Sequence, residues 1–355
     1  MQRPETDLGL NGPDQLAASV RAGDVRAVAR ACRMVDEAWP GHRELLAALF
    51  PHSKDSWRIG ITGSPGVGKS TLTSQLIGAL RSSGQRVAVV AVDPSSPFSG
   101  GALLGDRIRM QAHWDDPEVF IRSLATRGAM GGLSRTSADI ARVLAAWGAA
   151  AVLIETVGVG QDELDVMRVA DTTLVIQAPG GGDDLQAAKA GLLECADVFA
   201  VNKADLPGAE STAQHLRSML VLGQITASTA AFGSAHQGAH AVAIHAPKAE
   251  AGAEEAWEVP VVPCSAARGE GVADVLLALQ RHRAWLQRTR RGQERRLQRT
   301  RAELDALLAS TLASELSSRH KDELDALSLR IEAGEIDPYS ASTELVERWL
   351  NIPQS

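Results

Sequence analysis

Residues 63 to 71 read Gly63-Ser64-Pro65-Gly66-Val67-Gly68-Lys69-Ser70-Thr71 and directly follow the apolar stretch from Ile59 to Thr62. Glycines lack a Cβ, so successive backbone N–H groups can point at a bound phosphate, and the N-terminus of a following helix adds positive potential. In this pattern Lys69 reaches the β- and γ-phosphate oxygens, and the Ser70 hydroxyl is offered to Mg²⁺. The stretch therefore predicts a loop between a strand and a helix that binds a nucleoside triphosphate.

A second motif identifies the base. Asn202-Lys203-Ala204-Asp205 closes the strand-like run from Val198 to Val201. An aspartate at its end can accept hydrogen bonds from guanine N1–H and the exocyclic amine, whereas adenine lacks this donor pair and would leave the carboxylate unpaired. Cys264-Ser265-Ala266 follows the apolar run from Val259 to Val262, and we expect its loop to complete the base pocket. The motifs together predict GTP and GDP as ligands.

Length and composition are those of a large globular protein. With 355 residues, of which 45% are hydrophobic, the chain can bury one large core with accessory helices. The net charge of −7 disfavours general nucleic-acid binding, so the expected partner is a protein or a small molecule. The three cysteines are few and scattered, which excludes a disulfide framework and a C-x-x-C metal clamp and suits a reducing compartment.

The sequence also bears on location. Its apolar runs stay well short of the roughly 18 residues that a membrane span needs. The N-terminus carries Glu5, Asp7 and the single basic Arg3, which fits neither a secretory signal nor an Arg-rich transit peptide. We expect a cytoplasmic protein without a membrane segment.

Short apolar runs alternate with helical stretches between residue 57 and about residue 285, which predicts a mostly parallel sheet covered on both faces. The expected fold class is α/β, a P-loop NTPase with a Rossmann-like sheet. Ligands of such sheets lie at the carboxyl ends of the strands, where both motifs fall. The runs predicted to be strands are 59–62, 86–92, 150–155, 172–177, 197–201 and 259–263.

Three parts are expected along the chain. Residues 1–50 are predicted to be an N-terminal helical extension in which Asp24 caps a helix. Residues 51–285 are the predicted P-loop GTPase domain. Within it, 224–257 turns to Ala, Gly, Ser, His and Glu without a clear period and is interpreted as a flexible insertion. Residues 286–355 are predicted to be a C-terminal helical arm.

The region that leads into this arm is basic. Nine arginines lie between 281 and 301, and a more acidic stretch follows to Asp325. The adjacent acids, the acidic net charge and the scarcity of aromatic residues favour a solvated helix face over nucleic-acid binding. Leucines at spacings of seven and four predict an amphipathic helix, interpreted as an arm for dimerisation or docking. They are Leu297, Leu304, Leu308, Leu312 and Leu316.

Carboxylates are expected beside the γ-phosphate. Glu155 opens the run Glu155-Thr156-Val157-Gly158-Val159-Gly160-Gln161 after a predicted strand. This places a carboxylate near Mg²⁺ and the backbone N–H of Gly158 within reach of the γ-phosphate. Asp93 and Asp106 can orient Mg²⁺-bound water, because Mg²⁺ keeps several waters and takes few carboxylates directly. The alternative is that both are turn or helix-cap residues.

Another glycine-rich run is Gly180-Gly181-Gly182-Asp183-Asp184-Leu185-Gln186, which precedes a helical stretch carrying Lys189. It is a further candidate for a mobile segment near the phosphates. Its alternative interpretation is the capped start of a helix.

Four longer strings follow GSPGVGKST in order: VDPSSPFSGGALLGDRIRM from 92, IETVGVGQDE from 154, PGGGDDLQAAKAG from 179 and NKADLPGA from 202. Together they resemble the MeaB/ArgK family of GTPases, the chaperones of adenosylcobalamin-dependent acyl-CoA mutases such as methylmalonyl-CoA mutase. The resemblance spans about residues 15 to 350.

The resemblance implies a homodimeric G protein that docks on a mutase. It would gate the loading of adenosylcobalamin from an adenosyltransferase, protect or reactivate the mutase, and use GTP hydrolysis as a timer. In the family, the stretch that matches Gly180 to Lys189 responds to the mutase, so Asp183, Gln186 and Lys189 are expected to couple the partner to hydrolysis. Asp162 stands where the family commonly has Ser, and several acyl-CoA mutases with such chaperones remain as the client.

The expected reaction is in-line attack of water on the γ-phosphate of GTP, with charge stabilised by Lys69 and Mg²⁺. Ser70, Asp93, Asp106 and Glu155 are expected to hold Mg²⁺ directly or through water. Gln161 is the candidate for orienting the attacking water, and Arg107 or Lys189 for approaching the transferred phosphate. Since the sequence offers no obvious general base, turnover is expected to be slow alone and stimulated by the partner.

Two other functions stay open. A nickel- or zinc-inserting GTPase shares the fold and the guanine motif but needs Cys/His clusters, for which the insertion offers His236, His240 and His245. A GTP-dependent kinase needs an acceptor pocket and a base near the γ-phosphate.

Overall fold

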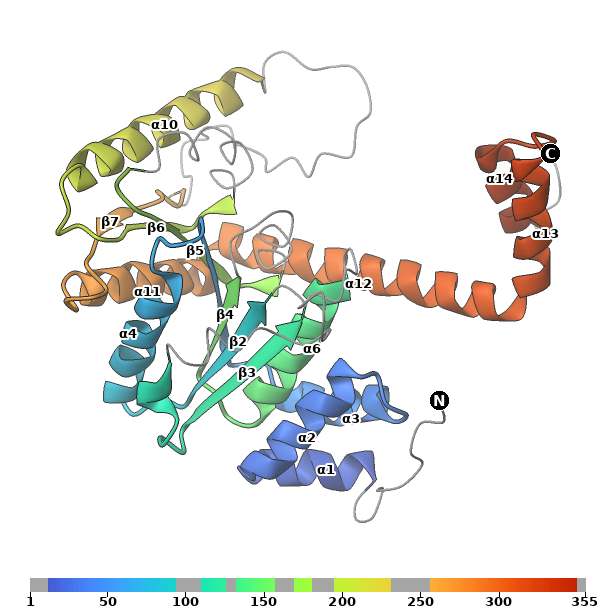
Figure 1. Cartoon of the computed structure of the whole chain (residues 1–355), viewed down its shortest axis with the longest axis horizontal. Helices are drawn as coiled ribbons and strands as arrows, with labels where there is room; N and C mark the ends of the chain where they lie inside the picture. The colour runs from blue at the N-terminus through green and yellow to red at the C-terminus, as the bar shows by residue number, and fades with distance from the viewer. Residues whose placement is uncertain are drawn as a thin grey trace. The chain divides into compact units, whose positions relative to one another are not determined.

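The computed structural model describes residues 12–93, 110–125, 132–156, 169–180, 195–230 and 256–349 (Figure 1). The chain forms two compact units, Met1–Gln293 and Glu294–Ser355. The first contains a β-sheet with helices around it, and the described part of the second is helical. Among the described residues, no helix combines the length and the apolar character needed to cross a lipid bilayer.

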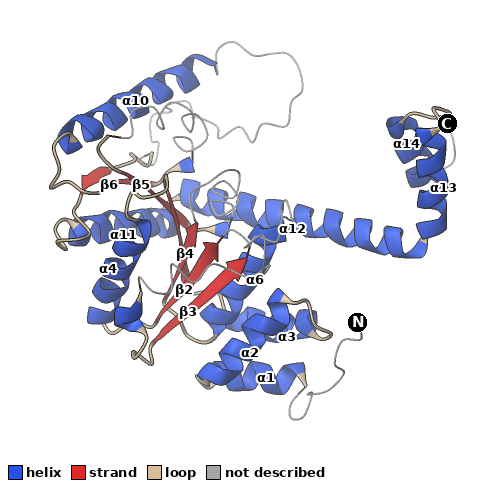
Figure 2. Ribbon diagram, viewed as in Figure 1, coloured by secondary structure: helices blue, strands red, loops and turns tan. Residues whose placement is uncertain are grey.

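A sheet of seven parallel strands is the centre of the described part of the first unit (Figure 2). Its order is β3-β2-β4-β1-β5-β6-β7, so β1 (Trp57–Thr62) has β4 and β5 as neighbours. The predicted α/β fold with a parallel sheet is thereby confirmed. The other strands are β2 (Val87–Asp93), β3 (Val119–Ala125), β4 (Ala151–Thr156), β5 (Thr172–Gln177), β6 (Val198–Val201) and β7 (Val261–Pro263).

Six of the strands match the predicted runs, but β3 was not predicted from the sequence. It lies at the edge of the sheet, paired with β2 from Val87↔Val119 to Asp93↔Ala125. Its apolar residues are interrupted by Arg122, whose Nη2 donates to Asp36 Oδ2 at 3.0 Å. A charged residue in the middle of a short edge strand hides the apolar pattern on which the prediction relied.

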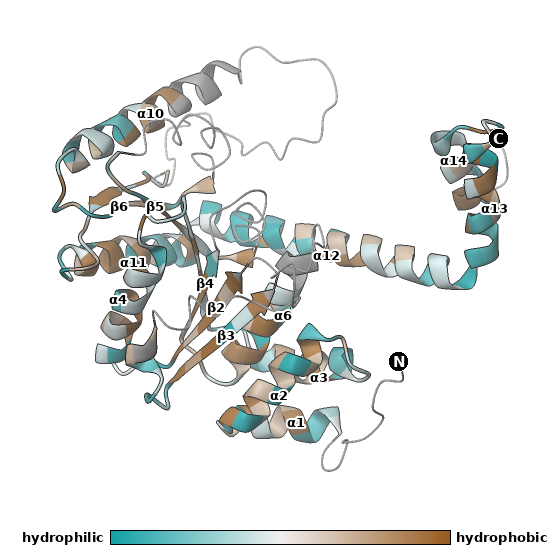
Figure 3. Ribbon diagram, viewed as in Figure 1, coloured by the Kyte–Doolittle hydropathy of each residue, from teal (hydrophilic) through white to brown (hydrophobic). Residues whose placement is uncertain are grey.

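Successive strand residues point to opposite sides of the sheet. Since the side chains on both sides are apolar and buried, helices cover both faces. On one face Ile59 and Ile61 pack in a cluster with Leu76 and Leu279 from two helices. On the opposite face a third helix packs on β2 and β4, and a fourth on β6. Figure 3 shows the apolar character of the strands between these layers. The four helices are α4 (Lys69–Ser82), α11 (Val272–Arg288), α6 (Gly132–Ala146) and α10 (Ala209–Ala230).

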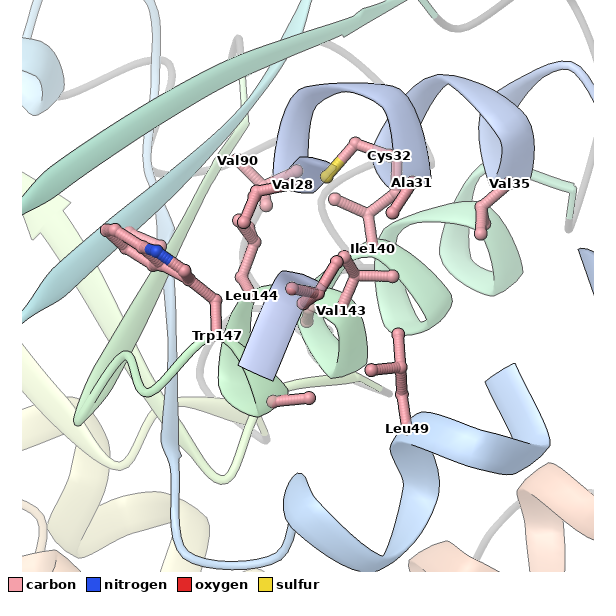
Figure 4. Close-up of a cluster of buried hydrophobic side chains, with 14 of the residues drawn as sticks. Val28, Ala31, Cys32, Val35, Leu49, Val90, Ile140, Val143, Leu144 and Trp147 are labelled. Carbon is pink, nitrogen blue, oxygen red and sulfur yellow. The ribbon is translucent and has the colours of Figure 1, made fainter. Parts of the chain in front are cut away.

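Three N-terminal helices pack against the α6 side of the sheet. The predicted cap at Asp24 is confirmed, since its carboxylate accepts from Arg26 N at 2.8 Å and Ala27 N at 3.4 Å. Val28 and Cys32 then face Val143 and Leu144 of α6, and all four are buried (Figure 4). These helices are therefore part of the same core as β2 and β4. They are α1 (Pro13–Arg21), α2 (Val25–Asp36) and α3 (His42–Leu49), followed by the short helix η1 (Phe50–His52).

The second unit consists of most of α12 (Arg290–Arg319) with α13 (Lys321–Glu332) and α14 (Pro338–Trp349). Leu327, Ala341 and Leu345 form a small core between α13 and α14. The helix predicted from the leucine spacing is confirmed as α12. Four of its leucines are exposed by half or more, namely Leu297, Leu304, Leu308 and Leu312.

Candidate functional site

The glycine-rich loop joins β1 to α4 and requires glycine at two of its positions. Gly63 has φ 143°, and a Cβ there would overlap the carbonyl oxygen of Ile176 on β5. Gly68 has φ 96°, and a Cβ there would overlap Nδ2 of Asn202. Both φ values lie in the region that L side chains avoid. Close packing against Ile176 and Asn202 thus fixes the backbone of the loop, which leads into the N-terminus of α4.

Lys69 is the first residue of α4, and its side chain folds back over the loop. Its Nζ donates to the carbonyl oxygens of Gly63 at 2.7 Å and Ser64 at 3.1 Å. The residue is buried, with 7% of its surface exposed. The ammonium group therefore lies within the loop, where its charge adds to that of the helix N-terminus.

Ser70, at the N-terminus of α4, lies beside Glu155 near the carboxyl end of β4. The Ser70 hydroxyl donates to Glu155 Oε1 at 2.7 Å, and both residues are buried. The register of the sheet places Glu155 beside Ile61, two residues before the loop begins. A hydroxyl and a carboxylate are oxygen ligands of the kind that Mg²⁺ takes, and Mg²⁺ commonly keeps several waters. The pair fits a magnesium site beside the phosphate loop.

Asn202 connects the phosphate loop to the loop after β7. Its Nδ2 donates to the carbonyl oxygen of Val67 at 2.7 Å, and its Oδ1 accepts from the backbone N–H of Ala266 at 2.9 Å. With 3% of its surface exposed, the side chain is buried between the two loops. The next residue, Lys203, has φ 58°, which turns the chain sharply after β6. The two loops are therefore fixed relative to each other.

Asp205 is held by the loop after β7. Its Oδ1 accepts from Ser265 Oγ at 2.7 Å, and Ala204 N donates to the Cys264 carbonyl oxygen at 2.9 Å. The Ser265 hydrogen bond is the main cause that lowers the pKa of Asp205 below its ordinary value, and the charge of Arg268 adds to it. Burial raises the pKa of the Cys264 thiol to about 12, so this thiol stays protonated at neutral pH. The Ser265 hydrogen bond thus holds the Asp205 carboxylate in place and favours its ionised form.

The structure brings a large part of the predicted site together at one edge of the sheet. The phosphate loop follows β1, Glu155 lies in β4, Asn202 follows β6, and Ser265 with Ala266 follows β7 (Figure 1). Asp93 ends β2 beside β4, so its backbone lies at the same edge, but its side chain is outside the described part. Other predicted residues lie outside the described ranges, and their roles stay predictions. They are Asp106, Arg107, Gly158, Gln161, Asp183, Gln186, Lys189, His236, His240 and His245.

The sequence did not predict how the chain after residue 109 is fixed to α4. The short helix η2 (Gln111–His113) brings the Nε2 of His113 within 3.0 Å of Ser74 Oγ. Asp116 accepts from Arg81 Nε at 2.8 Å, further along α4. These contacts join residues 35 to 39 positions apart, so local patterns carry no signal for them.

Comparisons with known proteins agree on the class. A family model described as "Methylmalonyl Co-A mutase-associated GTPase MeaB" matches residues 28–321. A putative GTPase of Pyrococcus abyssi is 38% identical over 335 residues, covering 94% of this chain and 96% of that protein. The mouse (Mus musculus) "Methylmalonic aciduria type A homolog, mitochondrial" is 30% identical over 280 residues, covering 74% of this chain and 61% of that protein.

The fold has a counterpart among solved structures. The crystal structure of a LAO/AO transport system kinase matches with a TM-score of 0.64 at 24% identity, covering 95% of this chain and 97% of that chain. At this identity the match concerns the fold.

Proposed function

The chain belongs to the family of methylmalonyl-CoA mutase-associated GTPases MeaB and is a GTPase, and on this premise we propose that it acts as the chaperone of an adenosylcobalamin-dependent acyl-CoA mutase. The observation that carries the nucleotide part is the position of Asn202, which joins the phosphate loop to the loop that holds Asp205. This contact supports the proposal that phosphate recognition and base recognition share one site.

In the proposed complex, GTP lies along the carboxyl edge of the sheet. The backbone N–H groups between Gly63 and Thr71, which Pro65 lacks, surround the phosphates, and Lys69 contacts the β- and γ-phosphates. The carboxylate of Asp205 accepts hydrogen bonds from the guanine N1–H and amino groups. The backbone of Ala266 lines the base pocket. GDP, which shares the base and the β-phosphate, is the product held by the same groups.

The magnesium proposal rests on the pair Ser70 and Glu155. Their oxygens are 2.7 Å apart in a buried position next to Lys69, which suits an oxygen-binding cation with few protein ligands. When bound, Mg²⁺ supplies positive charge to the β- and γ-phosphate oxygens. Asp93 and Asp106 are proposed to act on its water ligands.

Hydrolysis is proposed to proceed by in-line attack of water on the γ-phosphate. Lys69 and the N–H groups of the loop and of Gly158 stabilise the charge that develops on the phosphate oxygens. Gln161 orients the water, and Lys189 with Asp183 and Gln186 links this step to the partner. We expect slow turnover by the protein alone, with acceleration when the partner completes the site.

The partner proposal is supported by the family description and by the name of the mouse relative. We propose an acyl-CoA mutase as the client and an adenosyltransferase as the cofactor donor. We further propose a homodimer formed through the C-terminal arm, supported by the exposed leucines of α12.

The test is GTP turnover by the purified protein, alone and with each cobalamin-dependent mutase of the same genome, at matched Mg²⁺. Acceleration by one mutase supports the chaperone role and identifies the client. Acceleration by none contradicts that role and leaves a GTPase with a different partner. The matched control is Asp205→Asn with XTP, because an amide can donate to the xanthine 2-oxo group where the carboxylate accepts from guanine. If the Asp205→Asn variant hydrolyses XTP in place of GTP, the turnover belongs to this chain and not to a contaminating GTPase.

A further inference from the structure

The loop after β7 places the backbone of Arg268 close to Asp205. Ser265 and Glu270 form an antiparallel bridge, with Ser265 N donating to Glu270 O at 2.8 Å and Glu270 N to Ser265 O at 3.2 Å. Within this closed turn, Arg268 N donates to Ser265 O at 3.1 Å. Gly271 ends the turn with φ 70°, where a Cβ would overlap the carbonyl oxygen of Pro263. The backbone of Arg268 is thus set by its neighbours.

From this position the side chain of Arg268 reaches the carboxylate assigned to guanine. Its Nη2 lies 3.6 Å from Asp205 Oδ2, while Asp205 Oδ1 accepts from Ser265. Asp205 Oδ1 therefore accepts a hydrogen bond, whereas Oδ2 has an ion-pair contact that is too long for a hydrogen bond. The two partners differ in mobility, because the Arg268 side chain is 59% exposed whereas Ser265 is buried. Arg268 can leave the carboxylate without disturbing the core, and Ser265 cannot.

Arginine and guanine present the same chemistry to a carboxylate. Guanine offers two parallel donors, N1–H and the amino group, and a guanidinium offers a planar fork of N–H donors. A neutral hydroxyl uses one lone pair and leaves the others for the base. A cation beside the carboxylate both occupies the acceptor and repels the donor edge of guanine.

We propose that Arg268 competes with guanine for Asp205: its charge pairs with Asp205 Oδ2, and its side chain must move away when a guanine base binds. The inference rests on the proposed nucleotide site and deepens it. Because the competition is for the base, it weakens GTP and GDP binding equally. The preference between the two nucleotides stays unchanged.

The test uses fluorescent GDP and GTP analogues in equilibrium titrations of the full chain and of Arg268→Ala, Arg268→Gln and Arg268→Lys. We expect about threefold tighter binding of both nucleotides by the Ala and Gln variants, which is the size of a partly exposed ion pair. The Lys variant keeps the charge and should stay closer to the original protein. The gain should shrink at high salt, which screens the pair.

The matched control is Arg319→Ala, which removes one exposed arginine paired with Glu315 on α12 and leaves Asp205 untouched. It should bind both nucleotides as the original protein does. Inosine nucleotides, which lack the 2-amino donor, should gain less than guanine nucleotides from Arg268→Ala.

Unchanged guanine nucleotide binding by Arg268→Ala overturns the inference. Weaker binding also overturns it and would show that Arg268 instead supports the binding conformation of Asp205. Absence of guanine nucleotide binding by the original protein is a different outcome, which overturns the proposed site itself.

Discussion

The amide of Asn202 lies against Gly68, so close that a Cβ at Gly68 would overlap its Nδ2 atom. The same Nδ2 donates to the carbonyl oxygen of Val67. The contact is made by a residue from the base-recognition motif and a glycine from the phosphate loop, and each limits what the other position can accept.

Gly68→Ala tests this contact. The substitution combines an unfavourable φ of 96° with displacement of a buried amide, so we expect a loss of about 2–4 kcal/mol of unfolding free energy and weaker GTP binding by a factor of about ten or more. Urea unfolding and nucleotide titration measure the two effects. Gly84→Ala is the control, since it has φ 76° but a Cβ there would meet nothing within 4 Å among the described residues. An equal loss of unfolding free energy in both variants would show that the contact with Asn202 adds nothing to the cost of the unfavourable φ.

Ser265→Ala is expected to change how guanine binding depends on pH. The Ser265 hydrogen bond lowers the pKa of Asp205, so the carboxylate stays ionised as the solution becomes more acidic. Without the hydroxyl this pKa rises, and guanine affinity should begin to fall at a higher pH than in the original protein. The measurement is the dissociation constant for GDP from about pH 6 down to about pH 2.5, a range that spans the ordinary aspartate pKa of about 3.9, in steps of about half a unit. Identical pH profiles would contradict the assigned role of Ser265.

Glu155→Gln separates the magnesium role from the structural one. Glutamine keeps an oxygen that can accept the Ser70 hydroxyl, so the unfolding free energy should change little, but it removes the negative charge that favours a divalent cation. We expect GTP turnover to require about ten times more Mg²⁺ for its half-maximal rate. Titrating turnover with Mg²⁺ at constant GTP measures this, alongside thermal unfolding. A full loss of stability would instead indicate that the charge of Glu155 serves the fold.

Asp116→Asn tests the attachment of the segment after residue 109 to α4. The hydrogen bond from Arg81 is the main cause that lowers the pKa of Asp116 below its ordinary value of 3.8, and the backbone N–H of Glu118 adds to it. The depressed pKa contributes stability above pH 3.8 that is lost as the pH falls through the folded-state pKa. We expect the variant to lose less than about 1 kcal/mol at pH 7, and the difference to shrink in acid. Urea unfolding at pH 7 and near pH 3 measures the difference in unfolding free energy between the two proteins. A difference that stays constant would contradict the assigned role of the Asp116 charge.

The sequence was most informative where chemistry is carried by consecutive residues. The runs from Gly63 to Thr71 and from Asn202 to Asp205 each follow an apolar strand, and Glu155 lies near the end of another. The carboxyl ends of parallel strands meet at one edge. That geometry places them together without any knowledge of the contacts. The prediction of a parallel sheet was therefore enough to predict their proximity.

The parts that escaped prediction depend on distance in space. Asn202 contacts residues 67 and 266, and such partners leave no periodic trace in the chain. Arg268 belongs to none of the motifs, and its proposed role depends on its position beside Asp205 in space. Strand β3 was missed for the opposite reason, since Arg122 disrupts its pattern locally and is satisfied by Asp36 from a distant helix.

The shared core of α2, α6, β2 and β4 has a consequence for how the molecule unfolds. Val28 of α2 and Leu144 of α6 are fully buried in one cluster with residues of both strands. Opening the N-terminal helices would expose that entire layer to water, so they should form one foldon with the sheet. Amide protons of α2 and β4 should then exchange with solvent deuterium through the same opening event, at closely similar protection.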